Sequence, residues 1–201
     1  MIFLGPIYRM VATEYQTRIN HFPLIRLIFY SLDKTIFYLL IFMFLRIIWQ
    51  RWRHKRLKFS HELMLFLFVG YLLMLYFLTV FRGIYFPWQV KLDFDRSLNE
   101  INFVPLVETL KLIYGLSKLD FLYNLFGNIL WFIPFGIGLP ILMRRPTFAK
   151  VLLLGIMTSI SIEVFQFLLH TGITDIDDVI FNTVGTVIGF GLYRLFKRHS
   201  L

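Results

Sequence analysis

Four long apolar stretches constrain this chain more than any other feature. Each has about 20 mostly apolar residues, the length a helix needs to cross the hydrocarbon core of a bilayer. The stretches are Glu62–Phe81, Phe121–Met143, Phe148–Leu169 and Ile176–Leu195. The chain has 201 residues, of which 58% are hydrophobic and only 16% are charged, too apolar a balance for a soluble domain of this size. The sequence therefore predicts an all-α integral membrane protein.

A fifth predicted span, Thr35–Trp49, is shorter than the others. It reaches spanning length if it begins near Leu27, which brings Asp33 and Lys34 into the membrane. These two side chains then either pair with each other or lie at the interface, with the helix beginning at Ser31. We expect a polytopic bundle of five transmembrane helices. The alternative is four spans and an N-terminal helix that lies on the membrane face.

The spans divide the chain into two predicted parts. Residues 1–60 form an N-terminal extension with one span and a basic loop. Residues 61–199 form a membrane domain with four spans and an outer loop at 82–120. Within that loop, apolar residues at helical spacing predict a short interfacial helix over Val107–Leu116.

Basic residues gather in short runs beside the apolar stretches. Because Lys and Arg in short loops favour the cytoplasmic side, three runs predict the same side for the loops after the first and third spans and for the segment after the fifth. These runs contain Arg51, Arg53, Lys55, Arg56 and Lys58, then Arg144, Arg145 and Lys150, then Arg194, Lys197 and Arg198. This topology puts the N-terminus outside. The net charge of +9 is thus expected to contact anionic lipid headgroups rather than nucleic acid. The chain has no Cys, which excludes disulfides, a Cys-based zinc site and a thiol nucleophile.

Polar residues inside the spans cluster toward the predicted outer face. At 1.5 Å per residue, Asn128, Glu163 and Asn182 each lie about 10 Å below that face. A carboxyl group inside a membrane is costly, so Glu163 should face other protein groups or water, with Gln166, Asn128 or Asn182 as its partner. The sequence predicts a polar pocket that opens outward, with further acids at its rim. Its candidate residues are Asn128, Glu163, Gln166, Asp175, Asp178 and Asn182, and Asn124 shares the face of Asn128.

Small residues and prolines in the same spans predict structural features. Pro134 lacks a backbone donor and should kink or break its helix, two residues before Gly136. Gly185 and Gly189 form a small-xxx-small pattern that lets helices pack closely. Asp175 is alternatively a simple helix cap, and the Asn and Gln residues are alternatively glue between helices.

Four blocks of the chain resemble the VanZ-like family. Asn102-Phe-Val-Pro105 is similar to its N-x-x-P element, and the segment from Asn128 to Gly136 is similar to its N-x-x-x-F-(I/V)-P-(F/L)-G block. Ile162-Glu-Val-Phe-Gln166 resembles I-E-x-x-Q, and the segment from Asp175 to Gly185 resembles D-I-x-D-(V/L)-I-x-N-T-x-G. Many members carry Arg near position 173, where this chain has Ile. The resemblance implies a small multi-pass bacterial membrane protein, and it implies a link to glycopeptide resistance, chiefly to the lipid-tailed teicoplanin.

Three kinds of function fit these residues. In the first, the pocket binds or shields an amphiphile, either a lipid-linked cell-wall precursor or the lipid tail of the antibiotic. In the second, a membrane enzyme acts on a lipid-linked phosphate, with a divalent cation held by Asp175 and Asp178 and Glu163 as general acid or base. In the third, the interrupted helix around Pro134 belongs to a small transporter. We rank binding first. Binding and transport imply no cofactor, and the oligomeric state is left open by the sequence.

Overall fold

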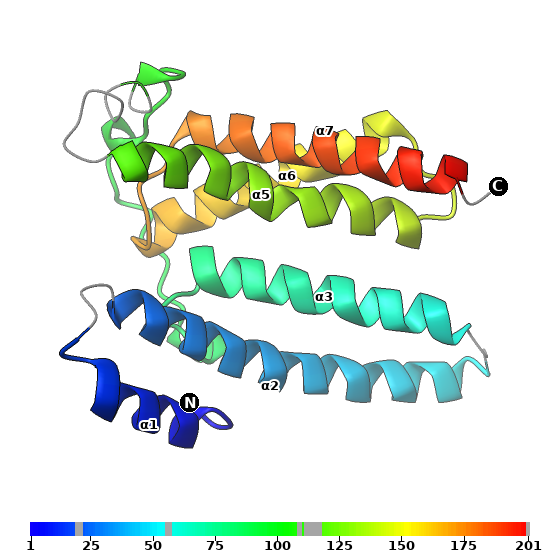
Figure 1. Ribbon diagram of the computed structural model, residues 1–201, viewed down its shortest axis with the longest axis horizontal. Helices are drawn as coiled ribbons and strands as arrows, with labels where there is room; N and C mark the ends of the chain where they lie inside the picture. Colours follow the sequence, from blue (N-terminus) through cyan, green and yellow to red (C-terminus); the bar gives the residue numbers. More distant parts are fainter. Residues whose placement is uncertain (19–21, 55–57, 108–109, 111–117, 200–201) are drawn as a thin grey trace. The chain divides into compact units, whose positions relative to one another are not determined.

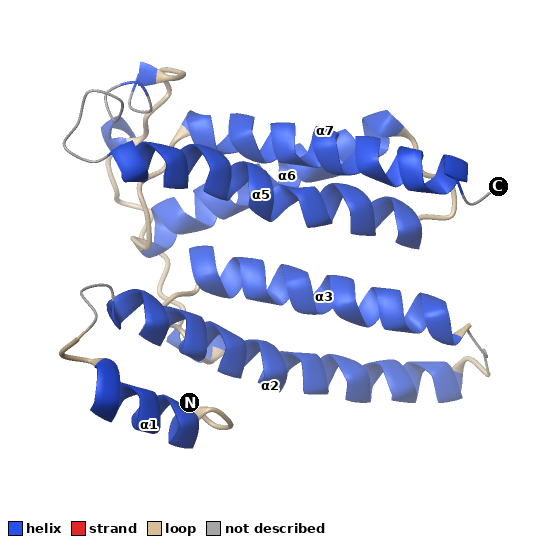
Figure 2. Cartoon of the chain, in the orientation of Figure 1, coloured by secondary structure: helices blue, strands red, loops and turns tan. Residues whose placement is uncertain are grey.

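The computed structural model describes residues 1–18, 22–54, 58–107, 110 and 118–199, with the backbone alone for 118–124 and 199 (Figure 1). Helices make up most of these residues, and loops connect them (Figure 2). Five helical segments are long and apolar enough to cross a membrane: Phe22–Trp52, Phe59–Thr79, Leu125–Leu142, Phe148–Leu169 and Ile176–Arg198. The chain divides into two compact units, Met1–Val90 and Lys91–Leu201. The prediction of a five-span helical membrane protein is confirmed.

Unit 1 contains α1 (Gly5–Tyr15), α2 (Phe22–Trp52), α3 (Phe59–Thr79) and the short 3-10 helix η1 (Pro87–Gln89). The helices α2 and α3 lie side by side (Figure 1). Near one end of the pair, Ser31 Oγ donates to the carbonyl of Phe77 at 3.0 Å. Near the other end, the Arg46 guanidinium donates two hydrogen bonds of 2.9 Å to the Glu62 carboxylate. The early part of α2 therefore meets the late part of α3, as in an antiparallel hairpin.

α2 begins at Phe22, five residues before the predicted start near Leu27 and well before the alternative start at Ser31. Asp33 and Lys34 are both fully buried, and the predicted pairing between them is wrong. Asp33 accepts hydrogen bonds of 2.7 Å from three successive backbone N–H groups at Ile2, Phe3 and Leu4. Lys34 donates to the carbonyls of Phe81 and Ile84. Each of the two side chains thus has its own backbone partners, which allows both to lie buried inside α2.

The loop after α3 folds back onto α2 through aromatic residues. Tyr85 is buried and donates its hydroxyl to Asp33 at 2.7 Å, and burial raises the pKa of the Tyr85 phenol. Phe86 and Trp88 stack with ring centroids 4.6 Å apart. α1 is too short to span a membrane, and Tyr8 on it packs against Phe22 and Phe29 of α2. Unit 1 therefore carries one more helix than its two spans, without replacing either span.

Unit 2 contains the 3-10 helix η2 (Leu98–Glu100) and the helices α5 (Lys118–Leu142), α6 (Phe148–Leu169) and α7 (Ile176–His199). α5 is continuous through Pro134 and Pro140. Of the predicted kink or break at Pro134, the break is therefore wrong, and the kink stays a prediction. A proline removes one donor, but unwinding in a membrane would expose many backbone groups that lipid cannot satisfy. The predicted interfacial helix Val107–Leu116 falls almost entirely outside the described residues.

Glycines hold α5 and α7 at very close range. A Cβ atom at Gly185 would lie 2.2 Å from the carbonyl oxygen of Ile129, and one at Gly189 would lie 2.2 Å from that of Ile133. A Cβ atom at Gly136 would lie 2.3 Å from the carbonyl oxygen of Thr186. These contacts are with backbone atoms, which a side-chain rotation cannot relieve. The packing role predicted from the small-residue pattern of α7 is thus the one seen.

Candidate functional site

The polar residues of unit 2 gather where α6 ends and α7 begins. Glu163, Gln166, Asp177 and Asn182 are buried there, and Asp175 and Asp178 are partly exposed. The Asn182 amide donates to Ser159 Oγ at 2.9 Å, which links α7 to α6. The structure therefore brings the predicted residues of these two helices to one end of the unit.

Glu163 has a different partner from those predicted. Its Oε2 accepts a hydrogen bond of 3.0 Å from the backbone N–H of Asp175, and its backbone carbonyl accepts one of 3.2 Å from Thr174 Oγ1. Within the described part of the chain, its second oxygen, Oε1, accepts no hydrogen bond. The predicted pairing with Gln166, Asn128 or Asn182 is wrong, because the chain between α6 and α7 folds back over the carboxylate. Through this one oxygen, Oε2, Glu163 holds the start of α7.

Asn128 connects the third helix to this cluster. Its amide donates to Asp178 Oδ1 at 2.5 Å, which joins α5 to the first turn of α7. The side chain of Asn124 lies outside the described side chains. Gln166 is buried against Gly172 in the chain that leads to α7. Three helices therefore contribute polar groups, through the pairs Asn128–Asp178 and Ser159–Asn182 and through Glu163.

The outer loop is tied to this cluster through Asn102. Its backbone pairs with the start of α7 in a short parallel bridge, with N–H···O distances of 3.0 Å to Thr174 and from Ile176. Its amide donates to Asp175 Oδ1 at 3.0 Å, and its Oδ1 accepts from the N–H of Val104 at 3.1 Å. That last contact is an Asx turn that leads into Pro105. The N-x-x-P element therefore has a physical role, which is to turn the loop and fix it to Asp175.

Asp175 caps α7, and Asp177 holds the outer loop. Asp175 Oδ1 accepts from the N–H of Asp177 at 2.9 Å, which is helix N-cap geometry at the residue before α7. Asp177 is fully buried and accepts a 2.6 Å hydrogen bond from the N–H of Leu106 in the outer loop. Asp177 is not among the predicted pocket residues, because its partner comes from a loop that helix periodicity does not describe.

A second set of contacts ties the outer loop to the end of α6. Arg96 donates to the carbonyl of Phe167 at 2.8 Å, and the N–H of Asp93 donates to that of Leu168 at 2.9 Å. His170, in the left-handed conformation that ends α6, contacts Asp93 at 2.8 Å. This hydrogen bond holds the pKa of the Asp93 carboxyl below its usual value. The loop thus satisfies carbonyls that the end of a helix leaves without partners.

The acids of this end lie in a stretch of sequence without Lys or Arg. No Lys or Arg occurs between Val151 and Tyr193 in the sequence, whereas Glu163, Asp175, Asp177 and Asp178 all do. Within the described residues, no three His, Asp or Glu side chains group closely enough to hold a metal ion. The divalent cation at Asp175 and Asp178 stays a prediction. The arrangement suits a ligand that donates hydrogen bonds or carries positive charge.

The chain is similar to proteins of a known family. The model of the VanZ/LLP1 family matches residues 68–197. The chain is 34% identical over 134 residues to Protein VanZ of Enterococcus faecium, across 64% of this chain and 74% of that protein. No solved structure matches it. The family match includes the predicted blocks from Asn102 to Gly185 and covers more than half of the chain. The chain therefore belongs to the VanZ/LLP1 family.

Proposed function

We propose that the polar end of unit 2 binds the head of an amphiphilic cell-envelope ligand on the outer face of the membrane. By binding it, the protein protects the cell from a lipid-tailed glycopeptide such as teicoplanin. The observation that carries the proposal is Glu163, a carboxyl group in a spanning helix that is 5% exposed and has one oxygen without a hydrogen bond from any described residue. Because a carboxyl group inside a membrane is costly, retention of such a group favours a functional role.

The charges at this end indicate the chemistry of the ligand head. Glu163, Asp175 and Asp178 form no ion pair within the described residues, so this end repels a bare phosphate and attracts ammonium, hydroxyl or amide donors. An amine-bearing or hydroxyl-bearing head is therefore favoured over a phosphate head. A lipid-linked phosphate would need a bridging cation at the same place.

Apolar side chains beside the cluster offer room for the ligand tail. Phe103 and Val104 follow Asn102 directly, and their side chains are 66% and 58% exposed although the loop is fixed by hydrogen bonds. Ile173, on the chain leading to α7, is 77% exposed. An amphiphile with its head at the acids would lay its tail on these side chains and bury apolar area.

Glu163→Gln tests the proposal with little structural cost. The amide oxygen of Gln can still accept from the N–H of Asp175, while the ionisable carboxyl group is lost. The matched control is Asp95→Asn, which makes the same carboxyl-to-amide change at an exposed loop residue. Purified protein in mild detergent would be titrated with teicoplanin and with a glycopeptide that lacks the lipid tail.

We expect wild type and Asp95→Asn to bind the tailed compound, with Glu163→Gln weaker by about tenfold, which is about 1.4 kcal/mol. In cells at equal expression, Glu163→Gln should lose tolerance to teicoplanin. Unchanged binding and tolerance would contradict the proposal. A change in the mass of the bound compound during incubation would replace binding by an enzymatic function.

A further inference from the structure

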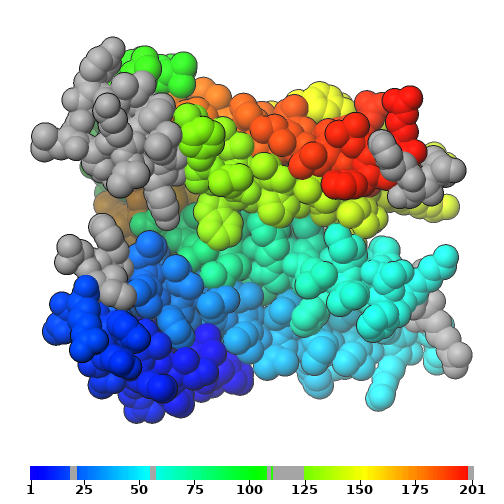
Figure 3. Space-filling model, in the orientation of Figure 1, coloured from blue at the N-terminus to red at the C-terminus, as the bar shows by residue number. Residues whose placement is uncertain are grey.

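The opposite end of unit 2 carries a second feature, which the polar cluster does not use. α6 runs toward the polar cluster and α7 runs away from it, so the start of α6 and the end of α7 lie far from the cluster. There Phe148 of α6 contacts Phe190 of α7, with ring centroids 5.6 Å apart. The connection between α5 and α6 and the last turns of α7 therefore meet at one end. In Figure 3 the last turns of α7, in red, lie on the surface of the molecule.

Six cations occupy this end, and the sequence beside them contains no acidic side chain. Arg144 and Arg145 lie on the connection into α6 and Lys150 lies in its first turn, whereas Arg194, Lys197 and Arg198 lie on the last turns of α7. All six are exposed, and no Asp or Glu occurs in residues 143–150 or 191–199. Within the described residues, none of the six forms an ion pair. Their charge is thus available to an external anion.

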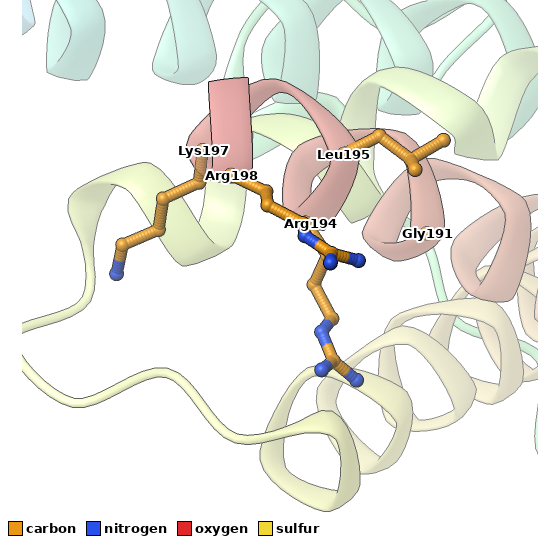
Figure 4. A pocket seen from close by; sticks show the side chains of 5 residues that line it. All are labelled: Gly191, Arg194, Leu195, Lys197 and Arg198. Carbon is orange, nitrogen blue, oxygen red and sulfur yellow. The ribbon is translucent and has the colours of Figure 1, made fainter. Parts of the chain in front are cut away.

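The cations line hollows in the surface rather than a flat face. One hollow of about 500 Å³ is lined by Met143, Arg144, Arg145 and Lys150. Another of about 660 Å³ is lined by Gly191, Arg194, Leu195, Lys197 and Arg198 (Figure 4). Arg194 and Arg198, one helical turn apart, extend their side chains in the same general direction, and Lys197 extends to another side of the helix (Figure 4).

The first turn of α6 adds partial positive charge to the first hollow. Thr147 caps the helix by accepting from the N–H of Lys150, which leaves other N–H groups of that turn directed out of the helix. Arginine forks match the geometry of phosphate oxygens. Leu195 and Met143 supply the apolar walls that an acyl chain needs.

We propose that this basic end of unit 2 binds the phosphate group of an anionic phospholipid, with Arg144, Arg145, Arg194 and Arg198 as its ligands. The general attraction of basic segments to anionic membranes has a different signature. It depends on the number of charges and not on where they lie, so removal of any two arginines would have the same effect. A site with defined ligands, in contrast, loses lipid binding only when its own arginines are removed.

The experiment compares double variants that lose the same charge. Arg144→Gln with Arg145→Gln, and Arg194→Gln with Arg198→Gln, each remove two arginines from the hollows. Arg51→Gln with Arg53→Gln removes two exposed arginines from the end of α2 and the turn that follows, in unit 1. The full-length protein in uncharged detergent is titrated with phosphatidylglycerol, phosphatidylcholine or inorganic phosphate, and the rise in Tm is measured.

We expect phosphatidylglycerol, and not phosphatidylcholine, to raise the Tm of wild type and of the control variant. Both hollow variants should lose more than half of that rise while keeping the lipid-free Tm of wild type. An equal loss in the control variant would overturn the proposal in favour of general charge attraction. An equal rise with inorganic phosphate would overturn the lipid as the ligand. A hollow variant with an altered lipid-free Tm would be judged by the other hollow variant, whose full retention of the rise would also overturn the proposal.

Discussion

Glu163 Oε2 accepts a hydrogen bond from the backbone N–H of Asp175, the residue that caps α7. One carboxylate thus fixes the start of the next helix through one oxygen and leaves the other oxygen without a partner in the described part of the chain. The outer loop is held at the same place, because Asn102 bonds to the Asp175 side chain. Binding at Glu163 would therefore be sensed by the helix cap and by the loop together.

The α5–α7 contact gives a sharp test in two substitutions on one helix. Gly189→Ala would place a Cβ atom 2.2 Å from the carbonyl oxygen of Ile133, so the backbones must separate. We expect a loss of about 1–3 kcal/mol in unfolding free energy, measured by denaturation in detergent. Gly191→Ala is the matched control, because a Cβ there meets nothing within 4 Å. Equal stability of the two variants would show that α5 and α7 are not in close contact.

Asn102 is predicted to hold the outer loop. Asn102→Ala removes the hydrogen bond to Asp175 and the turn at Val104, and should cost about 1 kcal/mol. Amide hydrogen exchange should become faster at Val104 and Ile176. Asn99→Ala is the control, since the Asn99 side chain makes no hydrogen bond within the described residues. If both variants exchange alike, Asn102 is not the anchor.

The contact between Asp93 and His170 predicts an acid dependence of the loop. The pKa of Asp93 is held below its usual value, so its contribution to stability is complete above the unfolded pKa of about 3.9 and is lost as pH falls through the folded pKa. Asp93→Asn should therefore lower the Tm at pH 6. It should also lack the part of the fall in Tm that protonation of Asp93 causes as the pH is lowered. Stability would be followed by Tm between pH 6 and pH 3. A variant that keeps the full wild-type acid step would contradict this assignment.

In unit 1, the pair between Arg46 and Glu62 suits a double-mutant cycle. Both side chains are about one-fifth exposed within a hydrophobic setting, and Gln50 also donates to Glu62. Arg46→Gln or Glu62→Gln alone removes one member of the pair and leaves the charge of the other without its ion-pair partner. The double variant should therefore lose less unfolding free energy than the two single variants lose in sum. The coupling energy from denaturation of the four proteins should be about 0.5–3 kcal/mol. A coupling of zero would show that the pair adds nothing.

Spans and packing glycines could be predicted from the sequence, because they depend on the spacing of residues along one helix. The predicted span Phe148–Leu169 is the observed α6, and the packing glycines Gly185 and Gly189 lie at the contact with α5. The start of α2 could not be predicted, because the groups that neutralise Asp33 come from Ile2 to Leu4 and from Tyr85, far along the chain. When such distant partners are unknown, charged residues beside an apolar stretch indicate the end of a spanning helix.

The candidate site was predicted in its members but not in its pairs. Asp178 and Asn182 are both predicted at the pocket, and the structure gives them the partners Asn128 and Ser159 on two other helices. Which residues meet across helices depends on helix rotation, which one sequence does not contain. Asp177 and Arg96 were not predicted as anchors, because their partners belong to a loop and to helix-end carbonyls.

The most direct test of the account is labelling from outside the cell. The chain contains no Cys, so a single Cys can be read without background. Asp178→Cys should react with a membrane-impermeant maleimide in intact cells, and teicoplanin should slow that reaction. Lys197→Cys, at the basic end, should react only after the membrane is opened. Labelling of Lys197→Cys in intact cells, with Asp178→Cys protected in the absence of any ligand, would contradict an outward-facing site.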